Sequence, residues 1–177
     1  MNHGHNLLKH LDIMSKNIKL EKDLYPHMCK WLREYLEDNY QNCEIIVEDT
    51  SQVCLDSVLD RHGVIDEYPE VIGVGIQIDV LGIVKEKRKT FLFFIEAKKT
   101  PLNTHDLGQI LVYSRICDPE KAFLFSSAGT GSLEKLIRQR EDLTFYGSNK
   151  RLKMIQVAKW DIVRNMPNVV SMIPKNI

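Results

Sequence analysis

The sequence predicts a mixed α/β protein in which one domain spans all 177 residues. Three apolar segments with the length and composition of strands come first, at 43–50, 74–84 and 90–99. A segment with helical spacing follows at 102–117, and a short apolar strand follows it at 121–127. A helix between two strands is typical of a crossover that pairs the strands in parallel. A chain of this length can bury one substantial core but is short for two.

The N-terminal part is expected to hold a flexible tail and then a helix. Residues 1–15 carry three histidines in a polar context, which indicates a loose tail rather than a metal site. Apolar residues recur at helical spacing across 18–40. Pro26 must then lie in the first turn of a helix that begins near Asp23, or kink a longer helix. Residues 50–70 are expected to form a loop with at most a short helix.

The C-terminal part continues the alternation of helices and strands. Asn103 or Thr104 can cap the helix that precedes the parallel strand, because both side chains accept hydrogen bonds from free backbone N–H groups. The spacing predicts a further helix over 133–142 and a further strand over 153–160. A short helix from about Asp161 is expected to close the chain.

Cysteine usage and hydropathy limit the environment of the protein. The chain has four cysteines and no CxxC pair, which argues against a zinc site and for reduced thiols in the cytoplasm. No apolar run approaches the roughly 20 residues that span a bilayer, so we expect no membrane partner. The first residues lack the charged and then apolar regions of a secretory signal.

The charges are unevenly distributed along the chain. The formal net charge is zero at pH 7, so the total charge gives no argument for a nucleic-acid partner. Residues 1–70 contain 14 Asp or Glu and 7 Lys or Arg, whereas residues 71–177 contain 10 and 17. The basic part could face a polyanion. Scattered charge on a solvated surface is the simpler interpretation of this feature alone.

The apolar strand at 90–99 ends in charged residues, which raises the question of what they do there. If a hairpin closed by Lys87 and Arg88 joins this strand to the preceding one, Asp79 lies directly opposite Glu96. Lys98 is two residues from Glu96 and so projects from the same face. Two carboxylates placed in this way repel each other unless a cation lies between them. The pattern predicts a cluster of three charges at one end of the sheet.

Structural explanations exist for each charged residue taken singly. A register shifted by one residue would move Asp79 to the opposite face. Asp79 could simply end a strand, and Glu96 could form an edge ion pair with Lys98. The three together, inside otherwise apolar strands, favour a functional site.

The same residues resemble the signature of a known family. Asp79 is followed by 16 residues and then by Glu96, Ala97 and Lys98, which resembles the PD-(D/E)xK nuclease superfamily. The residue before the aspartate is Ile78, where the family name has proline, although family members often lack that proline.

Two further features extend this resemblance to about residues 18–127. The helix after the lysine carries Gln109 and Tyr113 in a QxxxY pattern, which is similar to family members related to Holliday-junction resolvases and recombination nucleases. Many members also place a glutamate on the first core helix, and Glu21 is the match here. The resemblance implies a restriction-endonuclease-like αβββαβ core with a mixed central sheet flanked by helices.

The resemblance also implies an activity, which is metal-dependent hydrolysis of phosphodiester bonds, above all in DNA. Asp79 and Glu96 would bind Mg²⁺ or Mn²⁺, and the carbonyl of Ala97 is a possible further ligand. Lys98 would orient or deprotonate the attacking water, or hold developing charge. Glu21 would bind a second ion or the water shell of the metal. A role in repair, restriction or defence against mobile elements is open.

The same resemblance implies substrate contacts and partners. Gln109 and Tyr113 would shape the site and touch phosphate or base, and Lys87 and Arg88 could grip a nucleic-acid backbone. A solvated hairpin tip explains the last two equally well. A domain this small could act as a homodimer or with a partner subunit. The alternatives to a nuclease are a non-catalytic nucleic-acid-binding or assembly subunit on the same fold, and a purely structural domain.

Overall fold

The chain, in a computed structural model that describes residues 19–148 and 151–174, is built around one mixed β-sheet. The expected tail at 1–15 lies outside the described residues. Within the described ranges, the sheet has seven strands in the order β1-β2-β3-β4-β6-β5, with β7 paired to β6. The strands are β1 (Glu44–Asp49), β2 (Val80–Lys85), β3 (Thr90–Lys98), β4 (Lys121–Ser126), β5 (Phe145–Ser148), β6 (Arg151–Asp161) and β7 (Met166–Pro167).

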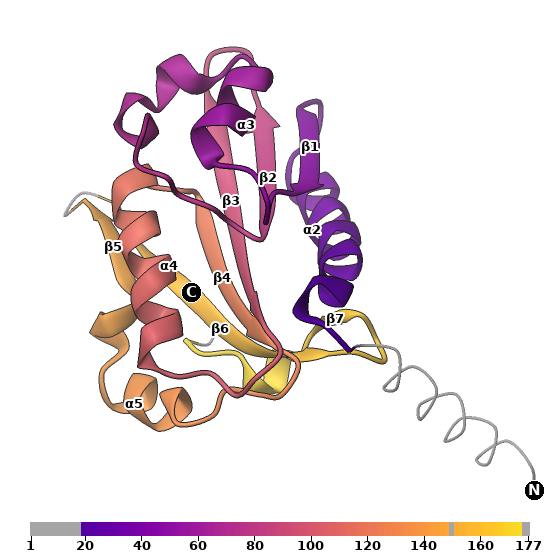
Figure 1. Cartoon of the computed structure of the whole chain (residues 1–177), viewed down its shortest axis with the longest axis vertical. Helices are drawn as coiled ribbons and strands as arrows, with labels where there is room; N and C mark the ends of the chain where they lie inside the picture. Colours follow the sequence, from indigo (N-terminus) through magenta and orange to yellow (C-terminus); the bar gives the residue numbers. More distant parts are fainter. Residues whose placement is uncertain (1–18, 149–150, 175–177) are drawn as a thin grey trace, which may run out of the picture.

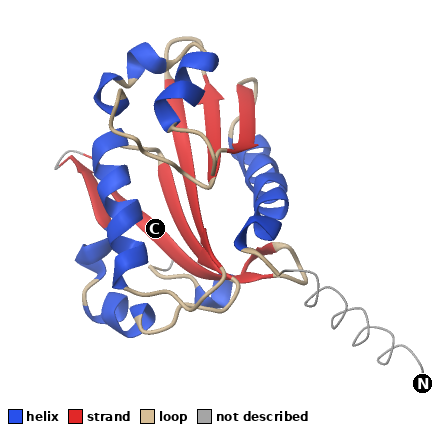
Figure 2. Ribbon diagram, in the orientation of Figure 1, coloured by secondary structure: helices blue, strands red, loops and turns tan. Residues whose placement is uncertain are grey.

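Helices cover both faces of this sheet (Figures 1 and 2). The α-helices of the described chain are α2 (Tyr25–Asn39), α3 (Leu55–Arg61), α4 (Thr104–Cys117) and α5 (Leu133–Gln139). Single turns of 3₁₀-helix are η1 (Glu21–Leu24), η2 (Ile65–Glu67), η3 (Pro69–Val71), η4 (Glu141–Thr144) and η5 (Val169–Ser171). Helix α2 packs on one face, whereas α3, α4 and α5 pack on the other. The predicted mixed α/β class is confirmed.

Strand β3 is buried on both faces, which explains why it reads as a continuous apolar run. Phe93 and Ile95 pack into the core beneath α2, whereas Leu92 and Phe94 pack into the core beneath α4. The predicted crossover is confirmed, since β3 and β4 pair in parallel and α4 connects them. Strands β1, β2 and β3 pair antiparallel.

The hairpin of β2 and β3 has the predicted register. Val80 pairs with Ile95 and Lys85 pairs with Thr90. The tip is closed by a hydrogen bond from the backbone N–H of Glu86 to the carbonyl of Lys89, 2.9 Å long. Continued by one residue, this register places Asp79 opposite Glu96, so the side chains of Asp79, Glu96 and Lys98 lie on one face of the sheet.

The predicted helix starts are also confirmed. Pro26 lies in the first turn of α2, where its missing N–H costs no helical hydrogen bond. Asn103 caps α4 by accepting hydrogen bonds from the backbone N–H groups of His105 and Asp106. The Asp106 carboxylate accepts the backbone N–H of Asn103 in return, which completes a capping box.

Two predicted elements are wrong. The second strand begins at Val80 and not at Val74, because residues 74–78 leave the sheet to form a loop whose Ile76 carbonyl accepts the backbone N–H of Leu55. The helix expected from Asp161 is a turn. The Asp161 carboxylate accepts the backbone N–H groups of Val163 and Arg164, and β7 follows the turn. Strand β5 was not predicted, since its four residues give no periodic signal.

None of the helices in the described ranges combines the length and the apolar character that crossing a membrane requires.

Candidate active site

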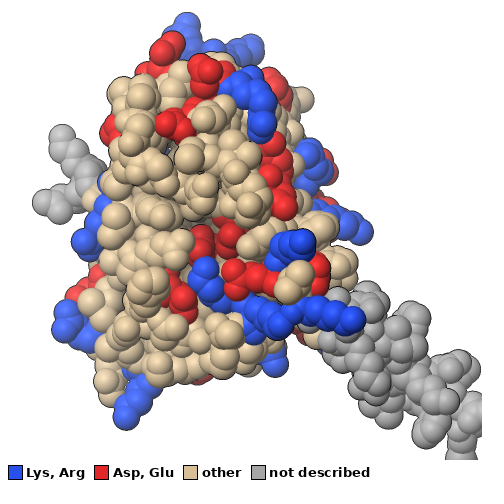
Figure 3. All heavy atoms as spheres, in the orientation of Figure 1, with Lys and Arg blue, Asp and Glu red and all other residues tan. Residues whose placement is uncertain are grey.

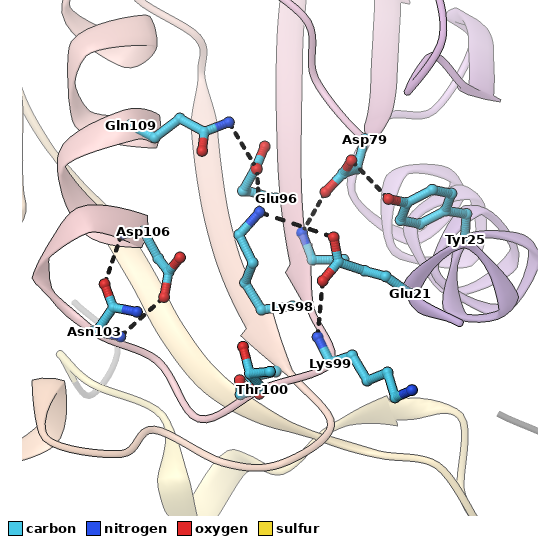
Figure 4. A network of polar contacts seen from close by, with 12 residues as sticks. Glu21, Tyr25, Asp79, Glu96, Lys98, Lys99, Thr100, Asn103, Asp106 and Gln109 are labelled. Carbon is cyan, nitrogen blue, oxygen red and sulfur yellow. Dashed lines mark hydrogen bonds and ion pairs between the residues drawn. The ribbon is translucent and has the colours of Figure 1, made fainter. Parts of the chain in front are cut away.

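The charged residues predicted to cluster do meet, at the end of the sheet where β3 finishes and β2 begins (Figure 4). The junction of η1 and α2 lies on one side of this cluster and α4 lies on the other. Glu96 is 2% exposed, and Asp79 is partly buried. Because a buried carboxylate is costly unless it is paired or bound to a cation, the arrangement calls for a compensating group.

Both carboxylate oxygens of Asp79 accept hydrogen bonds. The Tyr25 hydroxyl donates to Oδ1 at 2.9 Å, and the backbone N–H of Ala97 donates to Oδ2 at 2.8 Å. Burial nevertheless raises the pKa of Asp79 above its ordinary value, and these two donors only partly oppose that effect. Burial, followed by the charge of Asp79, also raises the pKa of Tyr25, so the phenol keeps its proton and acts as the donor.

Glu96 is held on one oxygen only. Its Oε1 accepts hydrogen bonds from Lys98 Nζ at 2.7 Å and from Gln109 Nε2 at 2.9 Å. Its Oε2 is buried and has no hydrogen-bond partner in the structure. Burial, and then the charge of Asp79, raises the pKa of Glu96 to about 7. An unpartnered buried oxygen on a carboxylate is an acceptor that a bound ligand could satisfy.

Lys98 supplies the cation of the cluster. Its side chain is 17% exposed and extends from the end of β3 toward Glu96. Burial lowers the pKa of Lys98, but the Glu96 carboxylate at 2.7 Å outweighs burial, so the pKa lies above its ordinary value. The side chain is therefore an ammonium at neutral pH, one positive charge beside two carboxylates.

Glu21 reaches the same cluster from η1, where it is the first residue. Its Oε2 accepts the backbone N–H of Lys99 at 2.9 Å, and its Oε1 lies 4.0 Å from Lys98 Nζ. These contacts join η1 to the end of β3, although the two segments are 78 residues apart. The structure thus brings Glu21 beside the other acidic residues, as the sequence predicts.

The other predicted residues divide into one at the site and three away from it. Gln109 contacts the site through Glu96. Tyr113 lies one turn further along α4, where its ring packs against the core between α4 and the sheet. Lys87 and Arg88 lie at the exposed tip of the hairpin. The tip is separated from Glu96 by most of β3, roughly 20 Å at about 3.4 Å per residue.

The loop after Lys98 is locked against the end of β4. Ser126, which is fully buried, pairs with Lys98 in the parallel register, and its hydroxyl donates to the carbonyl of Thr100 at 2.6 Å. The backbone N–H of Ser127 donates to the carbonyl of Lys98 at 3.1 Å. These bonds hold the backbone that carries the lysine, so its position is set by two strands.

Sequence reasoning missed Tyr25 and Ser126 as members of the site. Tyr25 lies four residues after Glu21, which places the two on one helical face, and this spacing was an available signal. Ser126 gave no signal, because a serine that ends an apolar strand is an ordinary turn residue.

The donor set fits a hard divalent cation. Among the residues that the structure describes, no three His, Cys, Asp or Glu side chains form a group that could hold a metal. Mg²⁺ needs no such group, because it commonly takes one or two carboxylates and completes its shell with water and substrate phosphate. Asp79 and Glu96 provide two carboxylates on adjacent strands, and the unpartnered Glu96 Oε2 provides an open oxygen.

The face that carries the site is hollowed and mixed in charge. Figure 3 shows acidic side chains gathered in a recess near the middle of this face, with basic side chains beside and below them. A negatively charged chain could place its phosphates on the basic rim and one phosphate near the carboxylates when a cation lies between them.

Comparisons of the chain with protein-family models, with curated proteins and with solved structures found no match.

Proposed function

We propose that the protein is a metal-dependent nuclease that hydrolyses phosphodiester bonds in DNA. The observation that carries this proposal is the group of Asp79, Glu96 and Lys98. Two carboxylates lie on opposed strands, the Lys98 ammonium contacts Glu96 at 2.7 Å, and Glu96 Oε2 lacks a partner among the described residues. A structural ion pair would need one carboxylate and one cation, and it would leave no buried acceptor open.

The order of elements around the site supports a restriction-endonuclease-like core. Helix α2 is followed by the antiparallel strands β1, β2 and β3, then by α4, then by β4 in parallel with β3. This is the αβββαβ order that the sequence resemblance implies. The insertion of α3, η2 and η3 between β1 and β2 leaves the strand pairing intact.

The residues of the site have separate tasks in the proposed reaction. Asp79 and Glu96 would hold Mg²⁺ or Mn²⁺, which when bound supplies charge to neutralise the phosphate and lowers the pKa of coordinated water. Lys98 donates hydrogen bonds and places a fixed positive charge where the pentacovalent phosphate develops negative charge. Gln109 holds Glu96 Oε1, and Glu21 holds the backbone after Lys98.

A non-catalytic nucleic-acid-binding or assembly subunit is the competing function. Burying two like charges lowers stability, and an unpartnered buried acceptor costs about 1–3 kcal/mol. In a binding subunit nothing offsets this free-energy cost, whereas in a hydrolase the binding of the cation offsets it. Both the nuclease and the non-catalytic subunit could act as a homodimer or with a partner subunit.

Metal binding and cleavage, measured in parallel, test the proposal. Calorimetry with Mn²⁺ and Mg²⁺ is expected to show binding to the wild type that Asp79→Ala abolishes. Asp38→Ala, an exposed change on α2, is the matched control and should bind as the wild type does. Supercoiled, linear and branched DNA are incubated with each protein. Absence of both metal binding at millimolar ion and cleavage would leave the binding-subunit function.

A further inference from the structure

We infer that Tyr25 is a positioning residue that fixes the Asp79 carboxylate and gives the site its preference for a small divalent ion, Mg²⁺ over Ca²⁺. This inference rests on the proposed function. Tyr25 is the first residue of α2, it is 5% exposed, and its hydroxyl donates to Asp79 Oδ1 at 2.9 Å.

The orientation of Asp79 is fixed from two sides. Tyr25 comes from the helical layer on one side of the sheet, and Ala97 comes from the neighbouring strand within it. Each donates to a different oxygen of the same carboxylate, at 2.9 and 2.8 Å (Figure 4). The carboxylate plane cannot rotate without breaking one of these bonds. Since the Ala97 N–H belongs to the backbone, the bond that a side chain contributes is the one from Tyr25.

The two carboxylates of the pair are therefore held differently. Glu96 receives both of its donors on Oε1 and leaves Oε2 open, whereas Asp79 has one donor on each oxygen. A cation at this site meets one oxygen that is free and one carboxylate that is held in a single orientation. Lone pairs remain on both Asp79 oxygens, because each oxygen has two and accepts one hydrogen bond.

Fixed orientation affects Mg²⁺ and Ca²⁺ unequally. Mg²⁺ requires near-ideal octahedral geometry at about 2.0–2.1 Å, whereas Ca²⁺ accepts irregular shells and bidentate carboxylates at about 2.3–2.6 Å. A carboxylate that cannot rotate suits monodentate binding of the smaller ion. A carboxylate that rotates freely can turn to bind Ca²⁺ with both oxygens. Loss of the Tyr25 hydroxyl should thus weaken Mg²⁺ binding more than Ca²⁺ binding.

The ring and the hydroxyl of Tyr25 have separable roles. The ring packs in the core beneath α2 with Leu24 and Met28, which is a structural role that phenylalanine keeps. The hydroxyl contacts Asp79. Tyr25→Phe therefore removes the positioning bond while it leaves the packing in place.

The test compares Mg²⁺ and Ca²⁺ binding by calorimetry in four proteins, namely the wild type, Tyr25→Phe, Tyr40→Phe and Asp79→Asn. Tyr40 ends the same helix, and its ring packs on Phe91 and Phe93 at the other end of β3. We expect Tyr25→Phe to bind Mg²⁺ about 10–100-fold more weakly, the usual effect of losing a partner of a metal ligand. Ca²⁺ affinity should fall much less, and Tyr40→Phe should match the wild type.

The outcomes separate this inference from the proposed function. Equal Mg²⁺ affinity, or an unchanged ratio of Mg²⁺ to Ca²⁺ affinity, in folded Tyr25→Phe would overturn the inference while the nuclease proposal stands. Absence of metal binding by the wild type would overturn both. Circular dichroism at the working temperature checks that Tyr25→Phe is folded, which is expected because the substitution removes one hydrogen bond and keeps the packing of the ring.

A measurement on the wild type covers the case in which Tyr25→Phe does not fold. When a cation binds Asp79, the hydrogen bond that the Tyr25 phenol donates must change in strength. Titration with Mg²⁺ is expected to give a tyrosine ultraviolet difference spectrum that saturates with the affinity found by calorimetry and is absent in Asp79→Asn. A wild type that binds Mg²⁺ with no such spectrum would overturn the inference.

Discussion

At the scale of single residues, the central feature is a pair of carboxylates on adjacent strands, Asp79 and Glu96, with the ammonium of Lys98 hydrogen-bonded to Glu96. Lys98 compensates one negative charge of the pair, and the remaining charge is relieved either by a proton or by a cation. Burial and the charge of Asp79 raise the pKa of Glu96 to about 7, which favours the proton when no cation is bound. Protons and divalent cations should therefore compete at Glu96, and the protein without metal should carry a measurable dependence on pH.

We predict that this dependence appears in the stability of the metal-free protein. The folded-state pKa of Glu96 lies above its ordinary value of 4.5, so the stability present below that value is lost as pH rises through about 7. From about pH 5 to about pH 8, the free energy of unfolding of the wild type should fall by about 1–3 kcal/mol more than that of Glu96→Gln. Urea denaturation in the presence of EDTA measures both.

The control for this experiment is Glu34→Gln, an exposed substitution on α2 that should follow the wild type at both pH values. Equal loss of stability in Glu96→Gln and in the wild type would show that Glu96 is ionised at an ordinary pKa, which contradicts the account of the buried pair.

A second prediction at this scale separates metal binding from catalysis. Lys98→Met should lower the rate of DNA cleavage by at least about 10²-fold, the size expected when a group that stabilises transition-state charge is lost. Mg²⁺ affinity should be kept or increased, because the substitution removes a cation from beside Glu96. Lys99→Met, whose side chain points away from the carboxylates in Figure 4, should retain cleavage. Undiminished cleavage by Lys98→Met would exclude the proposed role.

The sequence was sufficient to predict the charged residues of the site and Gln109, which contacts Glu96, but not Tyr25 or Ser126. Asp79, Glu96 and Lys98 follow from the period of two along paired strands and from an assumed hairpin turn, and the register confirms the turn. Tyr25 and Ser126 act through hydrogen bonds across 54 and 26 residues of sequence. The spacing of Glu21 and Tyr25 places both on one helical face, but it does not encode the contact with Asp79, which is visible only in the folded chain.

At the scale of elements, the site depends on a close approach between two loops that follow parallel strands. Gly131, after β4, has a φ of +55°, and a Cβ built on it would lie 2.5 Å from the carbonyl oxygen of Leu102. Leu102 in turn donates its backbone N–H to the carbonyl of Gly129. The loop that leads from Lys98 to α4 is thus pressed against the β4–α5 loop, and glycine is required at the contact.

We predict that Gly131→Ala lowers the free energy of unfolding by about 1–3 kcal/mol, because it adds strain at positive φ and a steric overlap with backbone. Gly108→Ala on α4 is the matched control. Its Cβ would meet open space, and it should raise helix stability by about 0.5–1 kcal/mol. Thermal denaturation measures both variants. Equal stability of Gly131→Ala and the wild type would contradict the close approach.

Elements whose sequence signals are periodic were predicted well, and those defined by irregular backbone were not. The apolar run of β3 and the capped start of α4 lie where the sequence places them. The segment before β2 alternates like a strand, but glycines at 73 and 75 with φ of +73° and +74° turn it out of the sheet. Alternation specifies which side chains are buried, and backbone conformation decides whether the segment pairs.

At the scale of the whole molecule, the layers of the fold determine where the polymeric substrate of the proposed nuclease would lie. Helix α2 and helix α4 cover opposite faces of the sheet (Figure 1), and the carboxylates lie at the end of the sheet between them (Figure 4). The hairpin tip with Lys87 and Arg88 is at the other end of β3. In the proposed nuclease, these two residues would contact a duplex only well away from the bond that is cut.

This separation predicts an effect that depends on substrate length. The double substitution Lys87→Ala and Arg88→Ala should leave Mg²⁺ binding and the cleavage of short duplexes unchanged. For long duplexes, each lost phosphate contact should weaken binding and lower the slope of log affinity against log salt by about 1. Fluorescence anisotropy at several salt concentrations measures the slope. An unchanged slope would identify the hairpin tip as a solvated surface, the other interpretation of these residues.

DNA cleavage is the most direct test of the proposal that Asp79, Glu96 and Lys98 form a metal-dependent phosphodiesterase site. Purified wild type and Asp79→Asn are incubated with supercoiled plasmid in Mg²⁺, in Mn²⁺ and in EDTA. We expect the wild type to nick or linearise the plasmid only with a divalent ion, and Asp79→Asn to do neither. Equal cleavage by both proteins, or cleavage by the wild type that persists in EDTA, would contradict the proposal.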